Sequence, residues 1–152
     1  MPDACATCAL LARRDAGDAP DWDAIQRTPA WDVVHAFDTA LPGWLVLVAR
    51  RHITAVADLD DAEAAVLGPL VAAVSRALHE VVGCTKTYVV QFAESRQHPH
   101  VHVHVIPRHQ DLPEELRGPG IFRLLGVAPE ARVSEARMEE IAMRVRQVLE
   151  RA

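Results

Sequence analysis

The sequence is poor in cysteine, has no excess of basic charge, and does not begin with a leader-like segment. Its 152 residues include three cysteines, an odd number that does not suit a framework of disulfides. Nothing near the first residues joins positive charge to an apolar stretch. We therefore expect a reduced cytoplasmic protein without disulfides or membrane spans.

The charge balance argues against nucleic acid as a partner. The formal net charge is −5, so no global basic field would attract a polyanion, and an anionic ligand would have to be held by local donors. Half of the residues are hydrophobic and about a quarter are charged, as in an ordinary soluble globular protein. A chain of this length is most simply one domain with a substantial core, and we expect residues 1–152 to form it.

Histidine, by contrast, is concentrated in one stretch. His98, His100, His102 and His104 follow one another at two-residue spacing and account for four of the eight histidines. Apolar residues alternating with one polar type predict a strand, on which these imidazoles share one face, roughly 6.5 Å apart, while the valines between them are buried. An exposed polar strand that happens to be rich in histidine is the alternative. The concentration favours a functional site.

Two kinds of chemistry fit such a row. A neutral imidazole can attack phosphorus and form a phosphoramidate that water later cleaves, while neighbouring imidazoles contact the phosphate and the leaving group. Histidine suits this role because its ordinary pKa of roughly 6.5 lets neighbours hold different protonation states. Alternatively, two or three of the imidazoles bind a metal directly and make a hydrolytic site. The spacing alone does not choose between them.

A second metal-binding pattern stands at the start of the chain, where Cys5 and Cys8 are separated by two residues. Two such thiolates can share a tetrahedral metal, usually zinc, if two further ligands come from elsewhere. The alternative is a short helical start in which both cysteines are small buried apolar groups. Redox activity is not expected, because the strand and helix of a thioredoxin-like context are missing.

The remaining pattern predicts an α+β fold, with antiparallel strands, a major helix inserted between them and a second helix at the end. A polar segment at 10–30 reads as a surface connection, and His35 on the first strand as structural or solvent-facing. Gly68-Pro69 should kink or divide the major helix. The expected elements are strands at 31–37, 44–49 and 87–93, a turn at 38–43, helices at 58–82 and from Ser134, and an irregular excursion at 108–132.

The stretch from His100 to Ile106, followed by Pro107-Arg108, resembles the signature of the histidine triad (HIT) family: His, apolar, His, apolar, His, apolar, apolar. Residues 41–53 look like that family's second strand and the basic-His turn after it, and TYVVQFAES looks like the strand before the triad. Cys5 and Cys8 resemble the N-terminal CxxC of zinc-containing bacterial members. The resemblance covers roughly residues 5 to 109, and residues 110–152 form a C-terminal extension that adds little to it.

The resemblance implies an antiparallel half-barrel with two helices, usually a homodimer. It also implies a nucleotide hydrolase or transferase that acts at an α-phosphate through a nucleotidyl-histidine intermediate. Its substrates would be dinucleoside polyphosphates or nucleoside phosphoramidates, and a phosphorylase is the nearest variant. On this pattern His102 is the nucleophile, His104 contacts the phosphate or assists the leaving group, Gln91 falls near a phosphate-contacting amide, and Asp38 near the ribose-binding position.

The resemblance also completes the ligand set of the cysteines. Cys5, Cys8, His52 and His100 would form a closed Cys2His2 site for structural zinc, within an N-terminal CxxC segment at 1–30. His98 could replace His100 as the fourth ligand. A metal held by His100, His102 and His104 instead remains an alternative.

The chain departs from the family pattern after the Pro-Gly of the hairpin. Trp44 stands where relatives usually carry a histidine, and its only polar group is a donor. We expect Trp44 to contact the nucleotide by stacking or filling space. The segment before the triad also lacks the usual Gly-Gln-Ser/Thr pattern. These departures keep open a nucleotide- and zinc-binding module with little catalysis.

Overall fold

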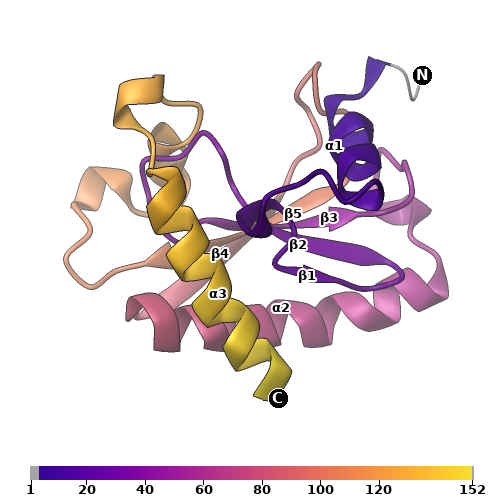
Figure 1. Cartoon of the computed structure of the whole chain (residues 1–152). Coiled ribbons are helices and arrows are strands. Elements are labelled where there is room, and N and C mark those ends of the chain that lie inside the picture. The colour runs from indigo at the N-terminus through magenta and orange to yellow at the C-terminus, as the bar shows by residue number, and fades with distance from the viewer. Residues whose placement is uncertain (1–3, 152) are drawn as a thin grey trace.

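The computed structural model describes residues 4–151 and is built on a five-stranded antiparallel sheet (Figure 1). The strand order is β1-β2-β3-β5-β4. Strand β5, which carries His102 and His104, therefore lies between β3 and the edge strand β4. The expected α+β half-barrel is confirmed. The strands are β1 (Gln26–Arg27), β2 (Trp31–His35), β3 (Leu45–Ala49), β4 (Lys86–Gln91) and β5 (His102–Arg108).

Alternation along the strands gives the sheet two different faces. One face carries Val33, Leu47 and Val103 and packs on α2 (Asp61–Val82) and α3 (Glu135–Arg151), which lie together on that side in Figure 1. The opposite face carries a second apolar cluster that includes Val46 and Ile106. It lies on the side of α1 (Ala6–Asp15). His102 and His104 of β5 share this second face.

Helix α2 is continuous, so the prediction that Gly68-Pro69 would divide it is wrong. Pro69 and Ala65, one turn before it, are both exposed, and water can therefore satisfy the carbonyl that loses its intrahelical partner. Asp60 and Glu63 form a capping box at the start, and Gly83 ends the helix in the left-handed conformation at φ +70°. The helix is long and apolar enough to pass a composition test for a membrane span, but in this fold it packs under the sheet.

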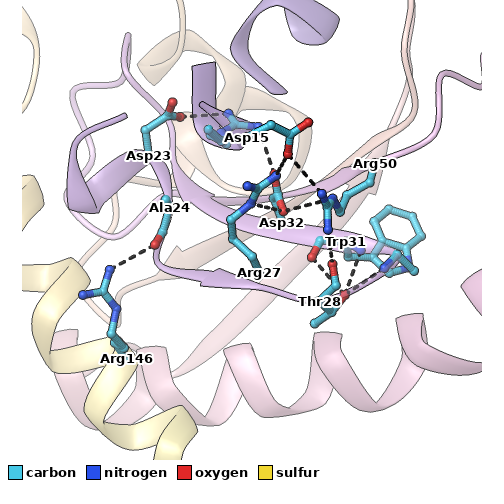
Figure 2. Close-up of polar contacts among 11 residues, drawn as sticks. Asp15, Asp23, Ala24, Arg27, Thr28, Trp31, Asp32, Arg50 and Arg146 are labelled. Carbon is cyan, nitrogen blue, oxygen red and sulfur yellow. Dashed lines mark hydrogen bonds and ion pairs between the residues drawn. The ribbon is translucent and has the colours of Figure 1, made fainter. Parts of the chain in front are cut away.

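The segment expected as a surface connection at 10–30 contains most of α1 and the short strand β1. A buried ion network ties these to the sheet. The fully buried carboxylate of Asp32 on β2 accepts two hydrogen bonds from Arg27, at 2.9 and 3.2 Å, and Asp15 joins Arg27 to Arg50 (Figure 2). Paired this way, the buried charge is compensated. The network holds α1 over the second sheet face.

The excursion after β5 consists of three short 3-10 helices, Glu114–Leu116, Gly118–Leu124 and Pro129–Ala131. The middle one carries Ile121 and Phe122 onto the second apolar cluster. Helix α3 then begins after Ser134, whose hydroxyl accepts the backbone N–H of Arg137, as expected for an N-cap.

Candidate functional site

A cavity of about 470 Å³ opens on the second face of the sheet. Histidines gather at one part of it, and most of the remaining wall is apolar. Such a cavity, mostly apolar with a few polar side chains, suits a small-molecule ligand. Its lining comes from α1 (Thr7, Leu10, Arg14), from Asp23, from β2 and its following loop (Val34, His35, Ala36, Phe37, Asp38), from β3 (Val46, Val48), from residues 92–95, from His98, His102 and His104, and from Phe122 and Leu125.

The spacing predicted one continuous strand for the four histidines from His98 to His104, and this prediction is wrong. Strand β5 begins only at His102, and a tight turn closed by the backbone bond from the His100 N–H to the His98 carbonyl precedes it. His102 and His104 line the cavity, whereas His100 is completely buried in another cluster. Because of this turn, the imidazole of His100 does not share a face with the imidazoles of His102 and His104. Val101, Val103 and Val105 are buried in the core, as the alternation predicts.

The tautomer of His102 follows from its partner. Its Nδ1 lies 2.7 Å from the backbone carbonyl oxygen of His100, and a carbonyl only accepts, so Nδ1 carries the proton. In the neutral ring the lone pair is therefore on Nε2. An imidazole held in this way can act as a nucleophile through Nε2, because the carbonyl stabilises the positive charge that develops on the ring.

His104 has the opposite tautomer. The indole N–H of Trp44 donates to its Nδ1 at 3.0 Å, so the proton of the neutral ring is on Nε2. Burial, and secondarily the charge of His102, lowers the pKa of His104 to about 4. Trp44 itself is fully buried and is absent from the cavity surface, contrary to the expectation that it would contact the nucleotide. It supports His104 from behind.

The other two residues expected to contact the nucleotide, Asp38 and Gln91, lie on different sides of the sheet. Asp38 lines the cavity, while Gln91 pairs with Val103 and so faces the side of α2. The Gln91 amide nitrogen is buried without a hydrogen-bond partner among residues 4–151. His98 lines the cavity and bonds through Nδ1 to the Thr7 hydroxyl at 2.8 Å. Burial lowers the His98 pKa, and Asp38 acts in the opposite direction.

A separate cluster contains one possible metal ligand from each of Cys5, Cys8, His52 and His100, all within 4.8 Å of one another. It is the one such group found among residues 4–151. The His100 Nδ1 lies 3.6 Å from each sulfur and 3.2 Å from the His52 Nδ1. A tetrahedral zinc with ordinary bond lengths requires about 3.6 Å between sulfur and nitrogen and about 3.3 Å between nitrogens. The Cys8 Sγ lies 3.2 Å from the His52 Nδ1, closer than a bound zinc would require, so the four side chains would fit a tetrahedral metal ion after a small adjustment.

Two further features suit this cluster to a metal. The His100 Nε2 lies 2.6 Å from the Ala49 carbonyl oxygen and donates its proton there, which leaves Nδ1 free as a ligand. Without a cation, burial and then the neighbouring Cys5 raise the pKa of Cys8 to about 11. A divalent ion would offset both effects by binding the thiolates. The grouping also separates His100 from His102 and His104, so it does not support a metal held by all three.

The family model of the HIT domain matches residues 20–111, more than half of the chain. The chain belongs to the HIT domain family. No curated protein matches it.

Solved structures with the same fold come from several organisms. A zinc-bound histidine triad protein from Mycobacterium smegmatis is similar at a TM-score of 0.67 and 18% identity, covering 99% of this chain and 96% of that one. A histidine triad protein from Bradyrhizobium japonicum gives 0.68 and 25%, covering 90% and 94%. A hypothetical histidine triad nucleotide-binding protein from Sulfolobus tokodaii gives 0.70 and 16%, covering 95% and 93%.

Sequence reasoning missed two contacts of the cavity histidines. The bond from Trp44 to His104 joins residues 60 positions apart, and the bond between Thr7 and His98 joins residues 91 apart. A donor-only side chain next to a strand rich in histidine was the available signal for the first. The second had none, because it depends on where the ion network places α1.

Proposed function

We propose that this HIT-domain chain is a nucleotide hydrolase or nucleotidyl transferase that acts at an α-phosphate through a covalent intermediate on His102. The observation that carries the proposal is the 2.7 Å contact of the His102 Nδ1 with the His100 carbonyl oxygen, which in the neutral ring leaves an unprotonated Nε2, on a residue that lines the cavity. Dinucleoside polyphosphates and nucleoside phosphoramidates are the proposed substrates.

We assign the other parts of a nucleotide to named groups of the cavity. In this proposal the Nε2–H of His104 donates to a phosphate oxygen near His102, since the two rings lie 5.0 Å apart. The Asp38 carboxylate accepts from the ribose hydroxyls. The apolar wall beyond it, which includes Val34, Val48 and Leu10, takes the base.

We further propose that Cys5, Cys8, His52 and His100 bind zinc in a structural role. The support is the near-tetrahedral spacing of the four ligand atoms and the zinc-bound relative from Mycobacterium smegmatis. A zinc ion bound here would supply a cross-link and no reactive group, because four protein ligands complete its coordination. The residues themselves join α1 to the end of β3 and to the turn before β5.

A homodimer formed through β4 completes the proposal. This strand lies at the edge of the sheet, where its outer backbone groups can pair with another strand. Val89 and Phe92 are about half exposed there, beside a second apolar cavity lined by Tyr88, Pro119 and Ile121. A second copy would cover both.

We also propose a cytoplasmic location, because free thiols such as those of Cys5 and Cys8 persist in a reducing compartment.

The experiment is a comparison of His102→Asn with the wild type on diadenosine triphosphate and on adenosine 5′-phosphoramidate. The asparagine amide can still donate to the His100 carbonyl but cannot attack phosphorus. We expect turnover to fall by roughly 10³-fold or more while binding of adenosine 5′-monophosphate and metal content stay unchanged. Mass spectrometry of the wild type, quenched early, should find a nucleoside monophosphate on the peptide that contains His102.

The matched control is His79→Asn, the same substitution at an exposed position of α2 away from the cavity. It should retain wild-type turnover. Retained turnover in His102→Asn would refute the covalent mechanism. Nucleotide binding without turnover in the wild type would favour the binding module instead, and a requirement for orthophosphate would identify a phosphorylase.

A further inference from the structure

The contact between Trp44 and His104 restricts what His104 can do. An indole nitrogen donates and never accepts, so its 3.0 Å bond to the His104 Nδ1 exists only while that nitrogen is unprotonated. A His104 that took up a second proton would place two N–H groups against each other. The ring therefore keeps one proton, on Nε2, for as long as the bond lasts.

We infer that Trp44 is a positioning residue that holds His104 as a neutral Nε2–H donor, so that His104 binds a phosphate oxygen but does not deliver a proton to the leaving group. This inference rests on the function proposed above. Of the two roles expected for His104, contact with the phosphate and assistance to the leaving group, the inference keeps the first. It depends on Trp44, which stands where relatives usually carry a histidine.

The surroundings keep the bond in place. Trp44 is fully buried, and His104 is only 6% exposed. Phe122 packs edge-on against both rings, with centroids 5.3 Å from each. Water therefore has little access to replace the indole, and burial favours the uncharged ring, in keeping with the lowered pKa of His104.

The consequence concerns the substrate class. When the Nε2 of His102 bonds to the α-phosphorus of a phosphoanhydride, the P–O bond breaks and the leaving phosphate chain departs as an anion that needs no proton. In a phosphoramidate the P–N bond breaks, and the amine nitrogen must gain one proton as it leaves. Losing its only proton would make His104 an anion, which is not accessible near neutral pH. The site should therefore prefer nucleotides whose leaving group is a phosphate chain.

The first test is the tautomer itself, read from ¹⁵N NMR of the His104 ring in the full-length protein. The wild type should show protonated Nε2 and unprotonated Nδ1. Trp44→Phe should give a mixture of tautomers, whereas Trp22→Phe, which removes an indole outside the cavity, should leave the tautomer unchanged. A wild-type His104 protonated at Nδ1 would overturn the inference, and this measurement needs neither activity nor a folded variant.

The second test is the ratio of kcat/KM for diadenosine triphosphate to that for adenosine 5′-phosphoramidate. The wild type should favour the triphosphate, and Trp44→Phe should lower the ratio by roughly tenfold or more, because the released Nδ1 can then accept a proton and make His104 an acid. A wild type that prefers the phosphoramidate, or a ratio unchanged in Trp44→Phe, would overturn the inference. No turnover of either substrate would refute the proposed function and leave the tautomer result standing.

Discussion

His35 makes the stability of this protein depend on pH. Its Nδ1–H donates to the Ala36 carbonyl at 2.7 Å, and its Nε2 accepts the backbone N–H of Gly43 at 3.0 Å. Both nitrogens are occupied and the ring is 1% exposed, so protonation would break the bond to Gly43 inside the core. Burial accordingly lowers the pKa of His35 to about 4.

The direction of the effect follows from proton binding. Between pH 4 and pH 6.5 the unfolded chain carries a proton on this histidine and the folded chain does not, so acid favours unfolding. The contribution of His35 is fully present above its unfolded pKa and is lost as the pH falls toward 4. A shift from 6.5 to about 4 corresponds to about 3 kcal/mol at the acid limit and about 2 kcal/mol at pH 5.

We therefore predict that His35→Gln reduces this pH dependence. The glutamine amide can both donate and accept but does not titrate. Urea unfolding at pH 7.5 and pH 5 should show the wild type losing about 2 kcal/mol more than the variant between the two conditions. Every other titratable group is the same in both proteins, so the difference isolates His35. Equal losses, within about 0.5 kcal/mol, would refute the reasoning.

Two further predictions concern the metal cluster and the exposed edge of the sheet. Cys8→Ser should lower the metal content measured by elemental analysis and remove the stabilisation by zinc, about 2.7 kcal/mol when free zinc is a hundredfold above Kd. Cys84→Ser, which removes the thiol outside the cluster, should leave the metal content unchanged; equal content in both variants would contradict the ligand set. Val89→Glu should shift sedimentation toward the monomer by placing charge on the β4 edge, whereas Val66→Glu on exposed α2 should not. A monomeric wild type, or a dimer unaffected by Val89→Glu, would exclude this interface.

Much of the fold could be predicted because its signals are local. The Pro42-Gly43 turn predicted the hairpin of β2 and β3. Gly43 has φ +88°, a conformation that favours glycine. The apolar stripe of α2 follows from spacing of three and four residues. Of the two effects predicted for Gly68-Pro69, a kink or a division, only the division is wrong. Whether the helix continues past Pro69 depends on which side of it faces water, and tertiary packing decides this.

The site was only partly predictable, for the same reason. Spacing along the chain correctly indicated where imidazoles gather, but it could not show that β5 begins at His102 and not at His98. It placed Gln91 near the phosphate, whereas the register with Val103 turns that side chain to the other face. These outcomes depend on strand pairing and a three-residue turn, which a short change in the loop would alter.

His100 joins the two halves of the site. Its side chain faces the cysteines through Nδ1 and the Ala49 carbonyl through Nε2, and its backbone carbonyl accepts the proton of His102. Because the ring is held at both nitrogens, the carbonyl of the same residue is held as well. If the proposed zinc site and the proposed nucleophile are correct, the cluster would support catalysis without contacting substrate, by keeping in place the carbonyl that accepts the His102 proton. This arrangement requires the turn that removes His100 from the strand, since a continuous row would direct its imidazole into the cavity.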